Sequence, residues 1–235
     1  MPLFIPYATL LILLSLAAGV FAIYSYRKKI NKSRQDRLLS LFLYALIGGI
    51  ISLSFTLFAL KFISALFNFA LLLSWSLAQQ ALYHIFFTGP LEEFSKLFAA
   101  FITYKIINNK FSEQMNNPID ALLQMANIAL GFSLIENIIF ASVSQDVEFI
   151  LLLRLIISTP AHILFTLFMA EAYYNVQKNN APFYTLIAPW AVASLAHGLF
   201  NAIPVFELSS SFLIIYLTFL AYLINMKYKK YLIQK

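Results

Sequence analysis

Two adjacent carboxylates and an ammonium group lie close together in an otherwise apolar stretch, GPLEEFSK, which spans residues 89–96. Ionisable side chains in or near hydrocarbon are costly, so they usually pair with each other and mark a site of chemistry or transport. Glu92 or Glu93 could activate a water molecule for hydrolysis, and Lys96 can pair with either carboxylate on one face of a helix. In the alternative interpretation, the two carboxylates only cap a helix that begins near Pro90.

A second group of ionisable side chains lies farther along the chain. Glu136 and Asn137 interrupt an apolar run, where a carboxyl group must be protonated or paired. Arg154 keeps its charge and needs an acidic partner, for which Glu136 and Glu93 are the candidates. A structural hydrogen bond from Glu136 to a neighbouring helix is the alternative to a catalytic role.

Two histidines also lie in apolar stretches, His162 and His197. His162 follows Arg154 at a multiple of four residues, so the two lie on one gradually rotating helix face. Pro160 predicts a kink beside His162, because proline removes a backbone hydrogen bond. Asn201 is one turn beyond His197 and is predicted to orient its imidazole.

Two imidazoles together with carboxylates suit a divalent cation, of which zinc is the first candidate. The predicted ligands are His162, His197 and Glu136, with one position left for water. The spacing His-Glu-x-x-His, which is typical of many zinc proteases, is absent, so a water activated by a glutamate alone is the other alternative. With or without a metal ion, the residue types predict a hydrolytic site.

The composition indicates that this site lies in a membrane. The 235 residues are 61% hydrophobic and only 11% charged, with a mean hydropathy of +0.80. Soluble proteins are about 25% charged. The net charge of +6 comes mostly from clusters beside apolar segments, which favours contact with acidic lipid head groups over nucleic-acid binding. The absence of cysteine excludes disulfides and thiolate metal sites.

The apolar segments predict an all-α, polytopic membrane helical bundle of about seven spanning helices. It would form a single integral-membrane domain, residues 1–235, with the catalytic core in 89–204. The predicted spans are 3–26, 38–61, 91–107, 118–142, 148–176, 183–203 and 208–226. A further segment, 63–88, is long enough to cross but carries several polar residues. It is predicted to be a non-crossing or re-entrant helical element.

Basic clusters predict the orientation, because cytoplasmic loops are rich in Lys and Arg. One cluster lies in residues 27–37 and another in residues 227–235. Both are predicted to be cytoplasmic, which puts the N-terminus outside and the C-terminus inside. The number of crossings is then odd, which requires 63–88 not to cross, and Glu92 and Glu93 lie near the extracytoplasmic surface.

Three other polar residues are predicted to have local roles. His84 lies within the segment 63–88 and is expected to pack locally or to serve the membrane interface. Glu171 lies near the cytoplasmic end of its predicted span and is expected to be hydrated or paired with another helix. Asp120 lies at a helix start, where a capping role is the default.

The order of these motifs resembles that of the PrsW-type intramembrane proteases, which are distant relatives of the CAAX prenyl proteases and bacteriocin-processing enzymes. The motifs that carry the resemblance lie in about residues 89–204 and are Glu92-Glu93-x-x-Lys96, Gly131-Phe132-x-x-x-Glu136-Asn137, Arg154 with His162, and His197-Gly198. The lysine after the glutamate pair favours the PrsW type, since the CAAX enzymes tend to have arginine one residue later. Asn201 stands where relatives often have aspartate.

The resemblance implies a multi-span prokaryotic protease of the cell membrane. Its substrate would be a membrane-anchored protein, such as an anti-sigma factor, cut near the extracytoplasmic surface. The implied catalytic or metal-binding residues are Glu92, Glu93, Glu136, His162 and His197, and the expected supporting residues are Lys96, Asn137, Arg154 and Asn201. The alternatives are a proton-coupled transporter and a non-catalytic membrane scaffold. The sequence shows no inverted repeat and no pair of broken helices, which disfavours a transporter.

Overall fold

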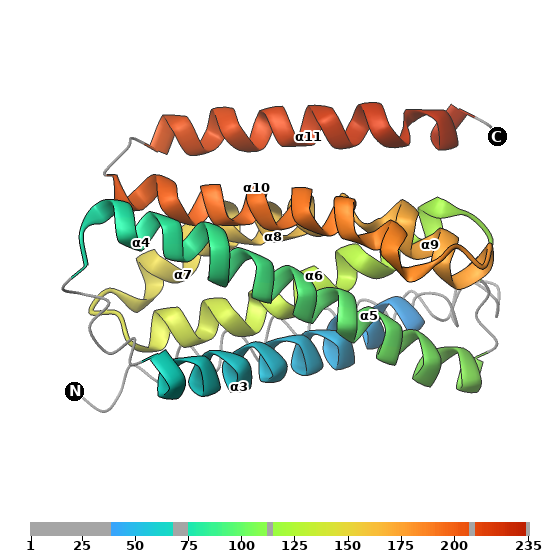
Figure 1. Cartoon of the computed structure of the whole chain (residues 1–235), viewed down its shortest axis with the longest axis horizontal. Coiled ribbons are helices and arrows are strands. Elements are labelled where there is room, and N and C mark those ends of the chain that lie inside the picture. The colour runs from blue at the N-terminus through green and yellow to red at the C-terminus, as the bar shows by residue number, and fades with distance from the viewer. Residues whose placement is uncertain (1–38, 68–74, 112–114, 207–209, 234–235) are drawn as a thin grey trace.

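A computed structural model describes residues 39–67, 75–111, 115–206 and 210–233 (Figure 1). Every regular element in these ranges is a helix, so the predicted all-α class is confirmed for them. The elements are η1 (Tyr44–Gly48), α3 (Gly49–Phe67), α4 (Leu77–Tyr83), η3 (His84–Thr88), α5 (Gly89–Phe111), α6 (Pro118–Ser142), α7 (Val147–Ile156), α8 (Ser158–Leu167), α9 (Ala170–Lys178), η4 (Phe183–Leu186), α10 (Ile187–Val205) and α11 (Ser210–Ile233). The predicted span 3–26 and the basic cluster 27–37 lie outside the described residues.

Five helices in the described part of the chain are long and apolar enough to cross a membrane. They are Leu39–Ala65, Pro118–Ser142, Val147–Leu167, Phe183–Val205 and Ser211–Tyr231. The chain is therefore an integral membrane protein of several spans. The predicted span 91–107 is not among the five, because α5 carries charged side chains at both ends, including Glu92, Glu93, Lys96 and Lys105.

Where the structure describes it, in residues 63–67 and 75–88, the segment predicted to be a separate non-crossing or re-entrant element is divided between two longer helical runs. Its first residues complete α3, which ends at Phe67, and α4 begins at Leu77 at the same end of the bundle (Figure 1). From Leu77 the chain is continuously helical through η3 and α5 to Phe111. At a rise of 1.5 Å per residue this rod is about 50 Å long, which exceeds the thickness of a bilayer core.

The predicted span 148–176 is interrupted twice. The first break lies at Ile157, between α7 and α8. It precedes Pro160 by one turn, where the proline ring would clash with the carbonyl of residue 156 in an unbroken helix. The interruption predicted from Pro160 is thus at Ile157, five residues before His162, which lies within the regular helix α8. The second break separates α8 from α9 at Phe168 and Met169, so α9 follows the spanning segment Val147–Leu167.

A close crossing of two helix backbones joins the α4–η3–α5 rod to α10. A Cβ atom added to Gly198 would lie 2.5 Å from the Ile85 Cα atom, and one added to Gly89 would lie 2.5 Å from the Ser194 carbonyl oxygen. Only glycine permits such an approach at these two positions. The crossing brings the first turn of α5 against the part of α10 that carries His197.

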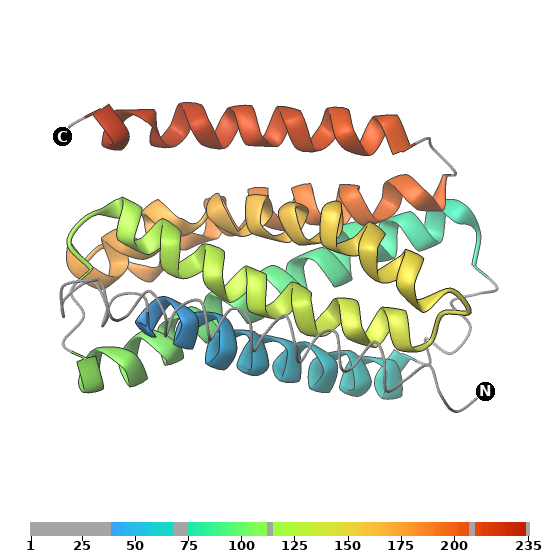
Figure 2. The ribbon, with the colours of Figure 1, turned by 180° about the vertical axis from the view of Figure 1, so that it is seen from behind.

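The last helix, α11, stands apart from the rest of the bundle in both views (Figures 1 and 2). It is the least buried of the five candidate spans. In its middle, Leu220 packs with Phe165 and Ala196, and Tyr216 donates a hydrogen bond to the Ala196 carbonyl at 2.7 Å. Near its C-terminal end, Lys227 donates a hydrogen bond to the Phe168 carbonyl at 2.6 Å and Tyr228 donates one to the Leu167 carbonyl at 2.9 Å. These carbonyls are free because the helix breaks between α8 and α9. The tail of α11 thus satisfies groups that the break leaves unpaired.

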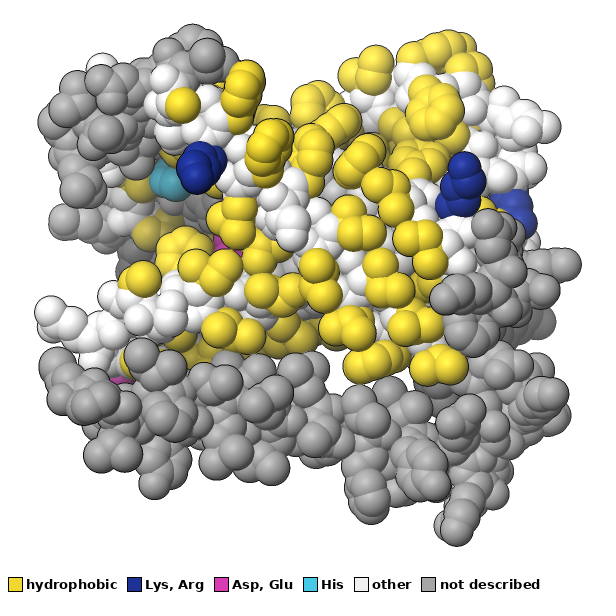
Figure 3. All heavy atoms as spheres, turned by 90° about the horizontal axis from the view of Figure 1, so that it is seen from below, with side chains coloured by type: hydrophobic (Ala, Val, Ile, Leu, Met, Phe, Trp, Pro, Cys, Tyr) yellow, Lys and Arg dark blue, Asp and Glu magenta, His cyan; other side chains and the backbone are white. Residues whose placement is uncertain are grey.

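The surface agrees with a membrane setting. Figure 3 shows apolar side chains over the middle of one long face and Lys or Arg side chains toward its two sides. The exposed apolar side chains include Phe58, Phe62, Ile215 and Phe219, which are more than half exposed. Such a broad apolar belt is unusual for a protein surrounded by water and suits contact with lipid.

Candidate active site

Four regions of the bundle bring the predicted site residues together around one cavity. Glu92 and Glu93 come from the first turn of α5, Glu136 from α6, His162 from α8 and His197 from α10. The cavity has a volume of about 330 Å³. Its wall includes Glu92, Glu136 and His162, together with Arg154 and Asn201.

Glu93 is fully buried, and both of its carboxylate oxygens accept hydrogen bonds. Oε1 accepts from the Lys96 ammonium at 2.6 Å and from His197 Nδ1 at 2.9 Å. Oε2 accepts from the Thr166 hydroxyl at 2.9 Å. Because its lone pairs are engaged and its charge is balanced by Lys96, Glu93 is a structural anchor for the residues around it.

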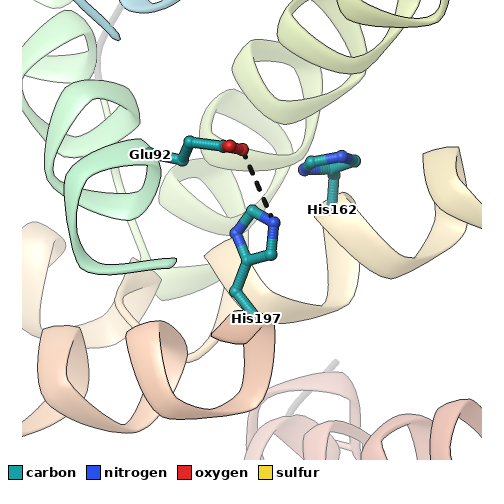
Figure 4. A group of neighbouring side chains, drawn as sticks. All are labelled: Glu92, His162 and His197. Carbon is teal, nitrogen blue, oxygen red and sulfur yellow. Dashed lines mark ion pairs between the residues drawn. The ribbon is translucent and has the colours of Figure 1, made fainter. Parts of the chain in front are cut away.

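His197 is oriented by Glu93 and faces Glu92 (Figure 4). Because Nδ1 carries the proton that it donates to Glu93, Nε2 of the neutral ring is an acceptor. Nε2 lies 3.5 Å from Glu92 Oε2. That oxygen is buried and has no hydrogen-bond partner among the described residues. A proton or a metal cation can fill the gap between the two facing acceptors, and a water molecule can approach the pair only from the cavity side.

The second half of the site is built on Glu136. Its Oε2 accepts hydrogen bonds from Arg154 Nη2 at 2.6 Å and from His162 Nε2 at 2.9 Å. Arg154 also donates from Nε to Asn137 Oδ1 at 2.9 Å. The predicted pairing of Arg154 with Glu136 is thus present, whereas Glu93, the other candidate partner, pairs with Lys96.

His162 has a partner on each ring nitrogen. The Lys96 ammonium lies 3.0 Å from Nδ1, and Nε2 faces Glu136. An ammonium group can only donate, so Nδ1 accepts and Nε2 carries the proton. His162 and His197 therefore hold opposite tautomers, and their rings meet edge-to-face with centroids 4.8 Å apart.

Glu92, His162 and His197 form a group that could hold a metal ion. All three are buried, and one possible ligand atom from each lies within 4.8 Å of the others (Figure 4). Two imidazoles and a carboxylate suit zinc in donor type, and the unpartnered Glu92 Oε2 is an available ligand atom. The His162 nitrogen that accepts from Lys96 would have to be released first. The sequence had predicted Glu136 in place of Glu92, but Glu136 is engaged by Arg154 and His162.

Two residues on the cavity wall differ from their predicted roles. Asn201 was expected to orient His197, but Glu93 does so, and Asn201 lines the cavity instead. His84 was expected to pack locally or to serve the interface, yet it also lines the cavity. Its position follows from the continuous rod, in which η3 directly precedes the first turn of α5.

Several buried hydroxyl groups support the site and were missed by the sequence reasoning. Thr166 holds Glu93, and Thr159 accepts hydrogen bonds from Asn137 at 2.9 Å and from Ser133 at 3.1 Å. A signal for Thr166 existed, because it follows His162 by four residues and so continues the same helix face. Thr159 lies beside a proline and no spacing rule distinguishes it.

The remaining polar candidates lie away from the cavity. Asp120 accepts hydrogen bonds from the backbone N–H groups of Asn116 and Asn117, which confirms its capping role. Glu171 pairs with Lys230 of α11 at 3.0 Å, as expected for a helix-paired residue.

Comparison with known proteins identifies relatives of this chain. A family model described as PrsW family intramembrane metalloprotease matches residues 37–226, which include all of the site residues. The protein named Protease PrsW from Oceanobacillus iheyensis is 29% identical over 120 residues, which cover 48% of this chain and 50% of the relative. The chain thus spans about half the length of the curated relative that it matches. No solved structure matches the chain significantly.

Proposed function

We propose that this chain, which belongs to the PrsW family of intramembrane metalloproteases, is an endopeptidase that hydrolyses a peptide bond in a membrane-anchored protein. One observation carries the proposal. Two buried acceptors, Glu92 Oε2 and His197 Nε2, face each other at 3.5 Å beside a cavity large enough for an extended peptide segment and a water molecule. A water molecule that reaches this pair from the cavity has two bases within reach, the Glu92 carboxylate and the His197 ring.

In the proposed reaction, Glu92 takes a proton from this water as its oxygen attacks the scissile carbonyl carbon. Glu92 then gives the proton to the leaving nitrogen, the C–N bond breaks, and the products are a carboxylic acid and an amine. Arg154 and Asn201 lie on the cavity wall and supply donors to the oxyanion. Glu93 keeps His197 in the tautomer that accepts at Nε2, as an orienting carboxylate does in other hydrolases.

The ligand atoms at this place are also of the kinds that a divalent ion binds. Glu92, His162 and His197 would hold it, and it would act as a Lewis acid on the scissile carbonyl. The hydrogen bonds from His197 Nδ1 to Glu93 and from His162 Nε2 to Glu136 would then fix the ligand rings. Metal-assisted and glutamate-only hydrolysis remain the two forms of the proposal, and metal analysis separates them.

The proposed topology has seven spans: the five apolar helices, the α4–α5 rod and the segment 3–26. Basic residues at one end of the bundle support a cytoplasmic C-terminus, since Lys105, Lys178 and Lys230 lie there with the C-terminal ends of α5, α9 and α11 (Figure 1). Lys61, near the other end, is an exception. The site would then face the extracytoplasmic half of a prokaryotic cell membrane, with the N-terminus outside.

The substrate class follows from this placement. A protein with one membrane span and an extracytoplasmic segment would present its backbone at the depth of the cavity. An anti-sigma factor, the substrate that the family resemblance implies, is a protein of this kind.

The test compares cleavage of a single-span model substrate by the purified wild type, Glu92→Gln and Glu171→Gln. Both substitutions replace a carboxylate by an amide, but only Glu92 lines the cavity. Glu92→Gln should lower the rate by about 100-fold to 10,000-fold, the usual contribution of a general base, whereas Glu171→Gln should cleave like the wild type. Equal cleavage by all three proteins would end the proposal. Metal content of the same samples, and the effect of a chelator on the wild type, distinguish the two forms.

A further inference from the structure

His84 is a half-buried polar residue on the cavity wall that the proposed reaction does not use. It lies on η3, next to Glu92 and Glu136 in the lining of the cavity. Its Nδ1 atom is buried and has no hydrogen-bond partner among the described residues. An unpaired buried imidazole nitrogen is costly unless a partner is present for part of the time.

The π turn explains why His84 faces the cavity. Eight residues separate His84 from Glu92, and in an uninterrupted α-helix they would differ by about 80° around the axis. The hydrogen bonds of a π turn reach one residue farther than those of an α turn, so each residue rotates less. The five residues of η3 therefore turn His84 back toward the face of Glu92. Single π turns are frequent at functional sites.

The crossing with α10 fixes this position. The His84 carbonyl oxygen would lie 2.8 Å from a Cβ atom on Gly198, the neighbour of His197. The backbone that carries His84 is thus packed directly against the backbone that carries His197. Because both backbones are held by this contact, the side chain of His84 keeps a constant place relative to the facing acceptors.

A membrane-anchored substrate brings its own unpaired groups to this cavity. Its backbone must be extended at the scissile bond, and each extended residue then exposes an N–H and a C=O group that no longer pair within a helix. Unpaired backbone groups away from bulk water need a partner in the enzyme. We propose that the His84 imidazole forms a hydrogen bond with the unwound backbone of the substrate. His84 is then a substrate-contacting residue of the site, an assignment that rests on the proposed function.

The test uses two substitutions of nearly equal size. His84→Asn keeps a polar side chain at this position, and His84→Leu removes it. With a single-span model peptide, His84→Leu should lower kcat/KM by about tenfold, the value of one hydrogen bond, and His84→Asn should stay within about threefold of the wild type. Phe86→Leu is the matched control, because Phe86 is on the same turn but is 66% exposed and lies outside the cavity lining.

A binding measurement separates this inference from the proposed function. The dissociation constant of the fluorescently labelled peptide is measured in the Glu92→Gln protein, with and without each His84 substitution. Weaker binding with His84→Leu than with His84→Asn supports the contact, even if the wild type cleaves nothing and the proposed function fails. Equal values for the two substitutions, in binding and in cleavage, would overturn the contact while leaving an active wild type as a protease. Absence of saturable binding would overturn both.

Discussion

Two glutamate–lysine pairs in this protein differ in their surroundings and in what they leave unpaired. In the site, Glu93 and Lys96 are both fully buried and lie 2.6 Å apart. At the C-terminal end of α11, Lys230 pairs with Glu171 at 3.0 Å, with 59% of the lysine side chain and 22% of the glutamate side chain exposed. The first pair is sealed from solvent, and the second is in contact with it.

The two clusters also differ in whether every polar group has a hydrogen-bond partner. Around Glu171, the polar groups satisfy each other: Tyr231 donates to its carboxylate, and its backbone N–H donates to the Tyr228 hydroxyl. Around Glu93, the hydrogen bonds are equally complete, but the neighbouring Glu92 Oε2 is left without a partner beside a cavity. The site thus differs from the cluster around Glu171 in one respect: Glu93 has all its hydrogen bonds, but the adjacent Glu92 keeps one acceptor atom without a partner among the described residues.

The largest expected effect comes from removing the buried cation. Lys96→Met leaves the Glu93 carboxylate buried without its counter-charge, so we expect the free energy of unfolding to fall by about 3–5 kcal/mol and cleavage to be lost. Lys230→Met is the matched change at the exposed pair and should leave thermal unfolding in detergent unchanged. The double variant Glu93→Gln with Lys96→Met should recover most of the stability without recovering activity. Similar unfolding temperatures for Lys96→Met and Lys230→Met would contradict the expectation that the buried pair matters more for stability than the exposed pair.

A smaller effect is expected at the backbone crossing of the site. Gly198→Ala places a methyl group 2.5 Å from the Ile85 Cα atom, so the rod and α10 must separate. We expect a loss of about 1–3 kcal/mol in the free energy of unfolding, as for other overpacked sites, together with a large loss of cleavage. Ala202→Gly, one turn farther along the same helix, removes a Cβ atom where Gly198→Ala adds one. It provides a control for the effect of helix propensity. A fully active Gly198→Ala protein would show that the crossing does not position His197.

At the exposed cluster, removing the carboxylate charge should have a minor effect. Glu171→Gln keeps the size of the side chain and should change the free energy of unfolding by less than about 1 kcal/mol, with cleavage unchanged. Thermal unfolding and the cleavage assay measure the two quantities. A loss of cleavage in this variant would indicate that the end of α11 is coupled to the cavity.

The smallest expected effect is on the local stability of the end of α11 at low pH. Burial alone would raise the pKa of Glu171, but hydrogen bonds from Tyr231 and Lys230 outweigh it, so the pKa in the folded protein is below its usual value. A carboxylate with a lowered pKa stabilises the fold above its unfolded pKa of about 4.3, and this contribution is lost as the pH falls through the folded value. The protection factors for hydrogen exchange at residues 227–231, which compare the observed with the intrinsic rate, should therefore fall below about pH 4, and Glu171→Gln should lack this step. The same loss of protection in both proteins would exclude Glu171 as its source.

The sequence predicted those features that depend on residue type and local pattern. The span 118–142 matches α6 because its start carries a capping box, in which Asn117 and Asp120 satisfy each other's backbone. The start of α4 carries the same signal, Ser76 with Gln79, which the interpretation of 63–88 did not use. Reading that signal would have shown a helix beginning at Leu77. The gathering of acidic residues and histidines was predictable, since buried charges require partners.

The pairing of each group was decided by the tertiary structure. Residue types alone allow Glu136 or Glu92 to face the two imidazoles, and allow Asn201 or Glu93 to orient His197. The choice depends on how far each helix is rotated and how closely it approaches its neighbour. The π turn of η3 and the glycine contact with α10 set these quantities for the rod, and neither follows from hydrophobic pattern. Composition and spacing therefore determined that a polar site lies within this membrane bundle, and helix packing over long sequence distances decided which acceptor remains free.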